Sequence, residues 1–242
     1  MKITKIVLVL LTLSLLFTGL VACDIMDNIQ EAPETTGASG TTATPDSNTG
    51  YCDMNAVANE IDSMSVSSFT ETTEKTEYVK FTVKDHGEFV VRLRADIAPI
   101  TVENFQKLVS EKFYDGLTFH RVVKGFMIQG GDPKGDGTGG SGTTIKGEFS
   151  QNGVRNQLSH ITGVISMARL SMPLDSATSQ FFVCNADASR SLDGGYAAFG
   201  YVVAGMETVL MISDVEVTYS SSGEMSKPLR TVVIEKVCFV TN

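Results

Sequence analysis

Residues 119–132 read FHRVVKGFMIQGGD, and this stretch says more about the fold than any other part of the chain. Two β-type runs, residues 118–123 and 126–130, lie on either side of a Lys-Gly pair that suits a turn between strands. Taken alone, an arginine on a strand, such as Arg121, is usually solvated or ion-paired. The apolar residues of the second run would usually be core residues. The function therefore has to be inferred from the motifs around this stretch.

Short strands and two helices are expected on both sides of it. Alternating apolar residues at 79–83 and 89–93 predict a β-hairpin. Pro99 then opens a helix whose apolar residues have helical spacing, and a second short helix is expected at 206–213. Many short strands with two helices favour a barrel or a sandwich over a doubly wound sheet. Further β-type runs lie at 163–168, 179–185, 197–203 and 231–240.

Four further motifs follow in order: GTGG at 137–140, GVISMA at 163–168, SQFFV at 179–183 and LDG at 192–194. Together with residues 119–132, they resemble the cyclophilin family in composition and order. The resemblance covers about residues 76–240. It implies a mainly β fold, a closed eight-stranded antiparallel β-barrel capped by two α-helices. It also implies peptidyl-prolyl cis-trans isomerase activity.

The resemblance also implies a role for each matching residue. Arg121 corresponds to the catalytic arginine, and Gln129 to a glutamine that holds the substrate backbone. Ala168 would line the adjoining groove, and Tyr196 would form an apolar wall with a hydroxyl, as in bacterial members. The proline pocket would consist of Phe126, Met127, Phe182 and Leu192.

The chemistry of the reaction explains these residue types. Prolyl isomerisation makes and breaks no covalent bond, and its barrier of about 18–20 kcal/mol is the loss of amide resonance. The proline nitrogen gains a lone pair in the twisted transition state, and a donor aimed at it stabilises that state over both planar isomers. Arginine stays charged and offers several donors in one plane. The reaction needs no nucleophile, metal or cofactor, and we predict none.

Two other functions are weighed against catalysis. A non-catalytic proline-peptide-binding or chaperone module could use the same groove, and loss of the arginine would favour it, but Arg121 is present. A solute-binding lipoprotein would have the same kind of N-terminus. That class needs a larger two-lobed domain than the remaining length can supply.

Several positions depart from the pattern of many relatives. Ser191 stands where eukaryotic members carry tryptophan, and the chain has no tryptophan. Because this removes a large contact surface for cyclosporin, we predict weak cyclosporin binding with activity retained. Arg169 replaces an asparagine, and residues 170–178 also differ, which could alter groove selectivity.

Other polar residues are expected to be structural. By the same resemblance His120 and His160 have structural roles, and His86 is expected in a solvated turn. GDGTGG at 135–140 satisfies G-x-G-x-x-G, but the residues after it do not begin an amphipathic helix, as a dinucleotide site requires. We predict a tight loop beside the groove.

Residues 1–22 are predicted to be a lipoprotein signal peptide. A basic start, an apolar run at 6–16 and LVA at 20–22 precede Cys23. This resembles the lipobox of bacterial lipoproteins, in which the cysteine is lipidated. An uncleaved anchor helix is the alternative, although the run is short for a hydrocarbon core of ~30 Å. We expect a protein anchored in the cell membrane by lipid on Cys23, on the extracytoplasmic side.

Residues 23–75 are predicted to be a flexible tether, and 76–242 the isomerase domain. The tether is acidic and rich in Thr, Ser and Gly, with a weak helix signal at 53–64. Residues 24–75 carry ten acidic residues and one lysine, whereas 76–242 carry eighteen acidic and sixteen basic residues. The net charge of −9 therefore belongs to the tether.

The distribution of charged residues and cysteines narrows the classes of partner that we expect. No basic stripe suggests nucleic acid binding. The expected partners are proline-containing unfolded or exported polypeptides and, through the lipid, the membrane; we expect a monomer. Cys184 and Cys238 lie in apolar stretches and should be small buried residues, whereas the state of Cys52 stays open.

Overall fold

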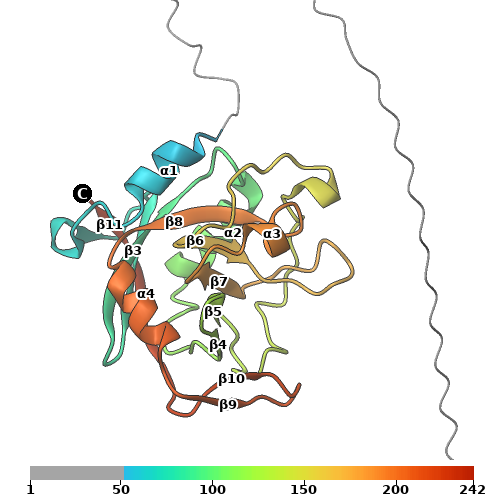
Figure 1. Cartoon of the computed structure of the whole chain (residues 1–242). Helices are drawn as coiled ribbons and strands as arrows, with labels where there is room; N and C mark the ends of the chain where they lie inside the picture. The colour runs from blue at the N-terminus through green and yellow to red at the C-terminus, as the bar shows by residue number, and fades with distance from the viewer. Residues whose placement is uncertain (1–51) are drawn as a thin grey trace, which may run out of the picture. The chain divides into compact units, whose positions relative to one another are not determined.

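The computed structural model describes residues 52–242, and a nine-stranded antiparallel sheet is its main element (Figure 1). The strand order is β1-β11-β2-β3-β8-β6-β7-β5-β4. The predicted mainly β architecture with an antiparallel sheet is confirmed. The strands are β1 (Thr70–Thr72), β2 (Tyr78–Val83), β3 (Gly87–Leu93), β4 (Arg121–Val123), β5 (Met127–Gly130), β6 (Val164–Met167), β7 (Phe181–Cys184), β8 (Ala198–Ala204) and β11 (Ile234–Thr241).

The alternation of side chains along the strands determines which residues form the core. In β2, Val79, Phe81 and Val83 are buried while the residues between them are partly exposed. This is the period of two expected for a strand with one face on the core. Phe81 pairs with Phe89 of β3, and their rings stack with centroids 4.6 Å apart. The central strand β8 is buried along its whole length.

The sheet has nine strands where eight were expected, because β1 adds a short strand to the edge of β11. β1 and β4 are the two ends of the strand order. An isolated bridge pairs Thr118 with Val233, just before β4 and β11 respectively. Beside it, the Phe119 amide donates to the carbonyl of Val232 over 3.0 Å. These bonds join the segment that enters β4 to the segment that enters β11.

Both predicted helices are present and pack on the sheet. Helix α2 (Pro99–Ser110) has Pro99 in its first turn and buries Val102, Phe105, Leu108 and Val109. Its N-terminus is capped by the buried side chain of Glu148, which accepts from the Thr101 amide at 2.7 Å. Helix α4 (Met206–Ser213) contributes Val209 and Ile212 to the same core. Between α2 and α4 lie two short helical segments, the 3₁₀ turn η2 (Ser150–Asn152) and α3 (Ser189–Leu192).

Residues 52–75 belong to the folded unit, so the prediction of a tether up to residue 75 is wrong. They form α1 (Met54–Glu60), the 3₁₀ turn η1 (Val66–Ser68) and β1. Cys52, Val57 and Phe69 are buried in a second apolar cluster with residues of β6 and β8. The misreading arose because these apolar residues are widely spaced among polar ones. The weak helix signal was correct, and the side chain of Asp53 caps α1.

A hairpin that the sequence did not predict follows α4. It consists of β9 (Val217–Tyr219) and β10 (Met225–Pro228), which pair with each other in a separate two-stranded sheet. Gly223 has φ +83°, a left-handed conformation that glycine adopts without steric cost, and it forms the tight turn. Val217 packs against the main core at the base of the hairpin. Figure 1 shows the hairpin at the lower edge of the molecule, below β4.

Several predictions concern residues outside the described part: the signal peptide at 1–22, the lipidated Cys23 and the tether up to residue 51. Within residues 52–242, none of the helices combines the length and the apolar character needed to cross a bilayer. In the same part, no cluster of His, Cys, Asp and Glu side chains is arranged to hold a metal. Cys52, Cys184 and Cys238 are free thiols. Cys184 is fully buried, which raises its pKa to about 12, and Cys238 is partly buried.

Candidate active site

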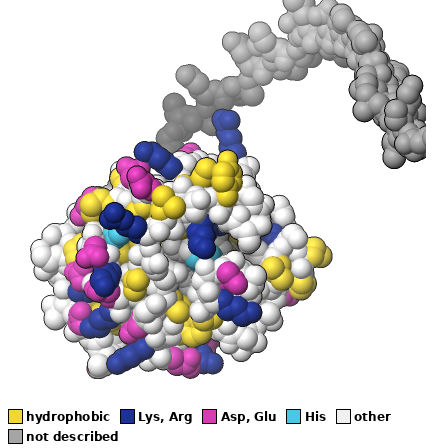
Figure 2. Space-filling model, turned by 90° about the horizontal axis from the view of Figure 1, so that it is seen from below, with side chains coloured by type: hydrophobic (Ala, Val, Ile, Leu, Met, Phe, Trp, Pro, Cys, Tyr) yellow, Lys and Arg dark blue, Asp and Glu magenta, His cyan; other side chains and the backbone are white. Residues whose placement is uncertain are grey.

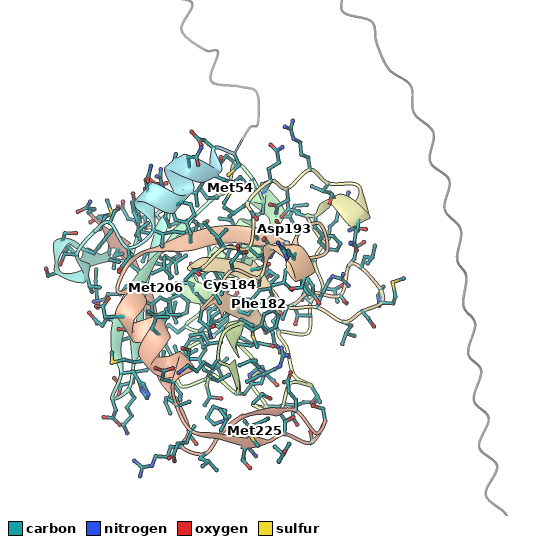
Figure 3. All side chains as sticks on the ribbon, viewed as in Figure 1. Met54, Phe182, Cys184, Asp193, Met206 and Met225 are labelled. Atoms are coloured by element: carbon teal, nitrogen blue, oxygen red, sulfur yellow. The ribbon has the colours of Figure 1, made fainter. Side chains whose placement is uncertain are left out.

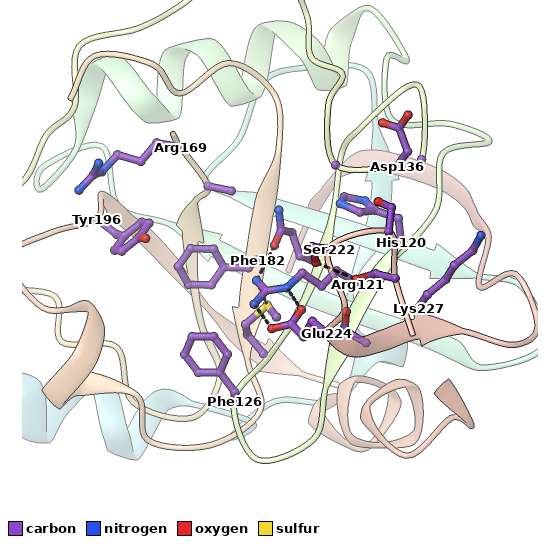
Figure 4. A pocket seen from close by; sticks show the side chains of 18 of the residues that line it. His120, Arg121, Phe126, Asp136, Arg169, Phe182, Tyr196, Ser222, Glu224 and Lys227 are labelled. Carbon is purple, nitrogen blue, oxygen red and sulfur yellow. Dashed lines mark hydrogen bonds and ion pairs between the residues drawn. The ribbon is translucent and has the colours of Figure 1, made fainter. Parts of the chain in front are cut away.

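One cavity of about 590 Å³ brings together all eight residues that the sequence predicted for the substrate site. They come from β4, β5 and β7, from the turn between β4 and β5, from α3, and from the segments that follow β6 and α3 (Figure 4). The predicted set is Arg121, Phe126, Met127, Gln129, Ala168, Phe182, Leu192 and Tyr196.

The apolar members of this set form one cluster, which we call the ring pocket. Met127, Phe182 and Leu192 are buried in it, with Phe126, Ala168 and Tyr196 partly buried beside them. The Phe182 and Tyr196 rings meet edge to face with centroids 5.8 Å apart. Because side chains alternate along β7, Phe181 points into the main core and Phe182 into the ring pocket. The cluster provides the apolar surface that a proline ring would contact.

A buried histidine supports the ring pocket from behind. His160 stacks on Phe182 with ring centroids 6.0 Å apart. Its Nδ1 lies 2.8 Å from Oδ1 of Asp193, and its Nε2 lies 3.0 Å from Oγ of Ser166. A carboxylate only accepts, so Nδ1 carries the proton and Nε2 accepts from the serine. Burial lowers the pKa of His160, against the opposing effect of Asp193, and the neutral ring is favoured. Two of the residues that contact His160, Phe182 and Asp193, are labelled in Figure 3, which draws the side chains of the described residues.

Asp193 orders the loop that carries Leu192 and Tyr196. Besides His160, its carboxylate accepts from the Ser159 hydroxyl at 2.5 Å and from the His160 amide at 2.8 Å. The LDG motif thus places Leu192 in the pocket through the aspartate that follows it. This is a physical reason for the residue order in the motif.

Arg169 has a structural role at the groove edge. Its guanidinium carbon lies 4.9 Å from the ring centroids of both Phe149 and Tyr196. Its Nε donates to the Gly195 carbonyl over 2.8 Å, and Nη1 donates to two carbonyls of its own loop. The side chain therefore holds Tyr196 in place by stacking and hydrogen bonding.

Arg121 projects from β4 toward the ring pocket. Figure 4 shows its guanidinium pointing at the rings of Phe126 and Phe182. Nη1 donates to Oε1 of Gln129 over 3.0 Å, and its distance to the sulfur of Met127 is 3.9 Å. The side chain is 34% exposed, so it is open to a ligand from the cavity.

Gln129 makes two bonds to the protein. Its oxygen must face Arg121, which only donates, and its Nε2 donates to Oε1 of Gln180 over 2.9 Å. Gln180 in turn donates to the carbonyls of Gly137 and Gly139. A hydrogen-bonded chain thus runs from Arg121 to the glycine loop. The second N–H of the Gln129 amide has no hydrogen-bond partner among the described residues.

The glycine loop at 135–140 is ordered by the buried Asp132. Its carboxylate accepts from the amides of Lys134 at 2.8 Å and Gly137 at 2.6 Å. Burial alone would raise the pKa of Asp132, but these amides outweigh it and keep the pKa low. Residues 131–149 contain no helix, so the loop lacks the helix N-terminus of a dinucleotide site. The loop lines the cavity, as predicted.

Sequence reasoning missed the charged residues that the β9–β10 hairpin adds to the cavity, Glu224 and Lys227. Glu224, in the turn of the β9–β10 hairpin, pairs with Arg121 through both carboxylate oxygens, at 2.6 and 2.8 Å. Three serines of the same turn, Ser220, Ser221 and Ser222, also line the cavity. The alternation in VTY at 217–219 and the SSSG turn signal could have predicted the hairpin, but not its contact with Arg121.

The face of the molecule drawn in Figure 2 has mixed charge. Figure 2 shows basic and acidic side chains interspersed over one face of the described residues. Charged side chains of the described residues also form ion pairs, among them Lys124 with Asp214 at 2.8 Å. A nucleic-acid surface would need a continuous basic stripe, and this face shows none.

Comparison with known proteins identifies the family. The family described as cyclophilin type peptidyl-prolyl cis-trans isomerase/CLD matches residues 78–238. Peptidyl-prolyl cis-trans isomerase B of Bacillus subtilis is 43% identical over 143 residues, which are 59% of this chain and 94% of that protein. Peptidyl-prolyl cis-trans isomerase A of Dickeya dadantii is 41% identical over 154 residues, covering 62% and 77% of the two chains.

A solved structure has the same fold. The crystal structure of a Cryptosporidium parvum cyclophilin type peptidyl-prolyl cis-trans isomerase, determined in the presence of the dipeptide Ala-Pro, matches with a TM-score of 0.60. The two sequences are 28% identical, and the match covers 68% of this chain and 99% of that one. With the sheet, the ring pocket and the arginine in place, the family match over residues 78–238 shows that this chain belongs to the cyclophilin-type peptidyl-prolyl cis-trans isomerases.

Proposed function

We propose that this isomerase binds X-Pro segments of exported, unfolded polypeptides in the cavity and accelerates their folding. The proline ring would occupy the ring pocket, with Arg121 beside the prolyl nitrogen. The observation that supports this is the direction of Arg121, whose guanidinium faces Phe126 and Phe182 (Figure 4).

The proposed mechanism uses one donor and one apolar surface. The ring pocket fixes the proline ring while the preceding carbonyl rotates about the C–N bond. As the nitrogen becomes pyramidal, an N–H of Arg121 donates to its lone pair, which exists only in the twisted state. The apolar side chains exclude water, so this hydrogen bond is less screened. Gln129 would hold the substrate backbone with its remaining N–H and keep Arg121 oriented with its oxygen.

The same cavity is formed within a single chain, so we propose that a monomer is sufficient. We also propose that the sheet closes into a barrel at the Thr118–Val233 bridge. Exchange protection of the Phe119 amide, which donates across this seam, would support closure.

The proposal of exported clients rests on the sequence before the described part. The pattern of residues 1–23 supports a lipoprotein on the extracytoplasmic side of the cell membrane. In a bacterial host, Cys23→Ala should release the protein from the membrane fraction and remove the lipid mass from the mature chain. Unchanged mass and fractionation would contradict the lipid anchor without affecting the isomerase assignment.

Catalysis of folding is tested on a protein whose refolding is limited by a trans-to-cis prolyl step, which is slow without a catalyst. The full chain should speed up this phase in proportion to its concentration. The Arg121→Ala variant should bind the unfolded client but leave the slow phase unchanged. Equal acceleration by both proteins would contradict the proposed role of Arg121 and would point to chaperoning on the same surface.

Cyclosporin should bind weakly. Ser191 is exposed on α3, and its hydroxyl donates to the Ala188 carbonyl over 3.0 Å, so it offers little apolar area. Inhibition of isomerisation should need at least micromolar drug. The variant Ser191→Trp should bind cyclosporin more tightly. Nanomolar inhibition of the unaltered chain would contradict this prediction.

A further inference from the structure

The ion pair between Glu224 and Arg121 joins two distant parts of the chain inside the cavity. Nε of Arg121 donates to Oε2 of Glu224 over 2.6 Å, and Nη2 donates to Oε1 over 2.8 Å. This fork-on-fork geometry fixes the plane of the guanidinium as well as its position. Figure 4 shows the carboxylate approaching from the hairpin, beside the rings of the pocket.

The hairpin is anchored, so Glu224 occupies a defined place. Val217 packs on the main core, and β10 packs against β4, the strand that carries Arg121. The amide of Ser220 donates to the carbonyl of Glu224 itself over 2.8 Å. Ser226, two residues further on, is buried.

The charge state of the pair is stable in neutral solution. The hydrogen bond from Arg121 lowers the pKa of Glu224 to about 2; burial opposes this, and a hydrogen bond from Ser226 adds to it. The carboxylate is therefore ionised wherever the enzyme would be assayed.

The pair leaves donors available to a substrate. A guanidinium has five N–H groups. Glu224 accepts from two of them and Gln129 from one. Of the remaining two, one is on Nη2 and has no acceptor among residues 52–242, and the other, on Nη1, has within that range only the weak sulfur acceptor of Met127 at 3.9 Å. Glu224 thus occupies one edge of the guanidinium while each terminal nitrogen keeps an N–H.

Two effects of Glu224 on catalysis oppose each other. Its negative charge weakens the positive potential at the cavity, which would reduce activity. Its contact removes rotamer freedom from a long side chain before substrate binds, which would increase activity. Arg121 and Glu224 are 34% and 40% exposed, so water screens the long-range potential. The orientation is set by direct contact and is not screened in this way, so orientation is the larger effect.

We propose that Glu224 is a positioning residue of the isomerase site: it holds the Nε–Nη2 edge of Arg121 so that the free N–H groups face the ring pocket. This inference rests on the proposed role of Arg121. It gives the β9–β10 hairpin, which lies outside the motif at residues 119–132, a role in catalysis.

The test is a double-mutant cycle on the full chain in detergent, with Glu224→Gln, Arg121→Ala and the double variant. The rate of cis-trans exchange of an Ala-Pro-containing peptide is measured by NMR at several concentrations to separate kcat from KM. Glu224→Gln should lower kcat/KM about three- to tenfold, mainly in kcat, because the ring pocket is unchanged. In the Arg121→Ala background the same substitution should have no further effect.

The matched control is Glu216→Gln, which removes an exposed carboxylate from the base of the same hairpin, outside the cavity. It should leave kcat/KM unchanged. A direct readout of position is the Nε–Hε signal of Arg121, which should be sharp in the unaltered chain and broadened in Glu224→Gln.

The outcomes separate the two proposals. If Arg121→Ala keeps full activity, the proposed function of that residue fails. If Arg121→Ala is inactive but Glu224→Gln has equal or higher activity, only the present inference fails, and Glu224 competes with the substrate instead. An unchanged Nε–Hε signal in Glu224→Gln would also overturn it.

Discussion

The two walls of the groove are built in different ways. The strand wall consists of β4, β5 and β7 with Leu192 and Tyr196; it is part of the main sheet, and its side chains merge into a buried cluster. The hairpin wall consists of the β9–β10 turn. Among the described strands β9 and β10 pair only with each other, β10 packs against β4, and Glu224 forms the ion pair with Arg121 of the strand wall. The contrast shows that the binding surface is fixed by burial, whereas the orientation of the arginine depends on a partly exposed contact.

The largest effect is expected from removing residues 52–75, which pack on β6 and β8 of the sheet that carries the strand wall. Cys52, Val57 and Phe69 share a cluster with Val164 of β6 and Ala198 of β8. A chain starting at Thr76 loses this burial, at about 1.5–3 kcal/mol per large apolar side chain, or about 5 kcal/mol in total. Urea unfolding should show a much lower midpoint than for a chain starting at Ser47. Equal midpoints would mean that residues 52–75 are a tether after all.

The second-largest effect is expected from a substitution within the strand wall. Phe182→Ala removes a buried ring that contacts both His160 and Tyr196. We expect a loss of about 3–5 kcal/mol in the free energy of unfolding and a rise in KM for proline peptides. Both are measured at a temperature at which the variant remains folded. A variant with normal KM would show that the proline ring binds elsewhere.

Acid should weaken the strand wall before the hairpin wall. Burial lowers the pKa of both His160 and His120 below the value near 6.5 of an unfolded histidine. The unfolded chain therefore binds protons first as the pH falls. Stability is fully present above about pH 6.5 and declines below it, by at most about 1.4 kcal/mol per pH unit for each histidine. Unfolding free energies between pH 8 and 5 check this, and His160→Asn should flatten the slope. A slope unaffected by this change would contradict the assignment.

The smallest effect is expected at the outer face of the hairpin. Tyr219 is 66% exposed and lies outside the cavity. Tyr219→Ala should change the free energy of unfolding by less than about 0.5 kcal/mol and leave isomerisation unchanged. A loss comparable with that of Phe182→Ala would mean that the two walls are equally integrated into the core.

The strand wall could be predicted because short stretches of sequence, each a few residues long, indicate its strands and its site residues. Alternation in β7 separates Phe181 from Phe182, and the family motifs assign Arg121, Gln129 and Leu192 to one groove. Helix α4 at 206–213 was also predicted with its observed bounds. In these segments local pattern and tertiary environment agree, which is the condition under which sequence reasoning works.

The parts that could not be predicted depend on distant contacts. Glu224 lies 103 positions from Arg121, and no local pattern connects them. Residues 52–75 are mostly polar, and their place in the fold follows from a few apolar side chains and from the bond of Glu60 to Tyr201, 141 positions away. Such docking is decided by the surface that receives the segment, which the segment itself does not encode.

The central claim is that Arg121, facing the ring pocket, accelerates rotation about X-Pro bonds. Its most direct test is the cis-trans exchange rate of an Ala-Pro-containing peptide, measured by NMR with the unaltered chain and with Arg121→Ala at equal concentration. We predict rapid exchange with the first and a rate at least about 100-fold lower with the second, with peptide binding and the fold retained. Equal exchange rates for the two proteins would contradict the account.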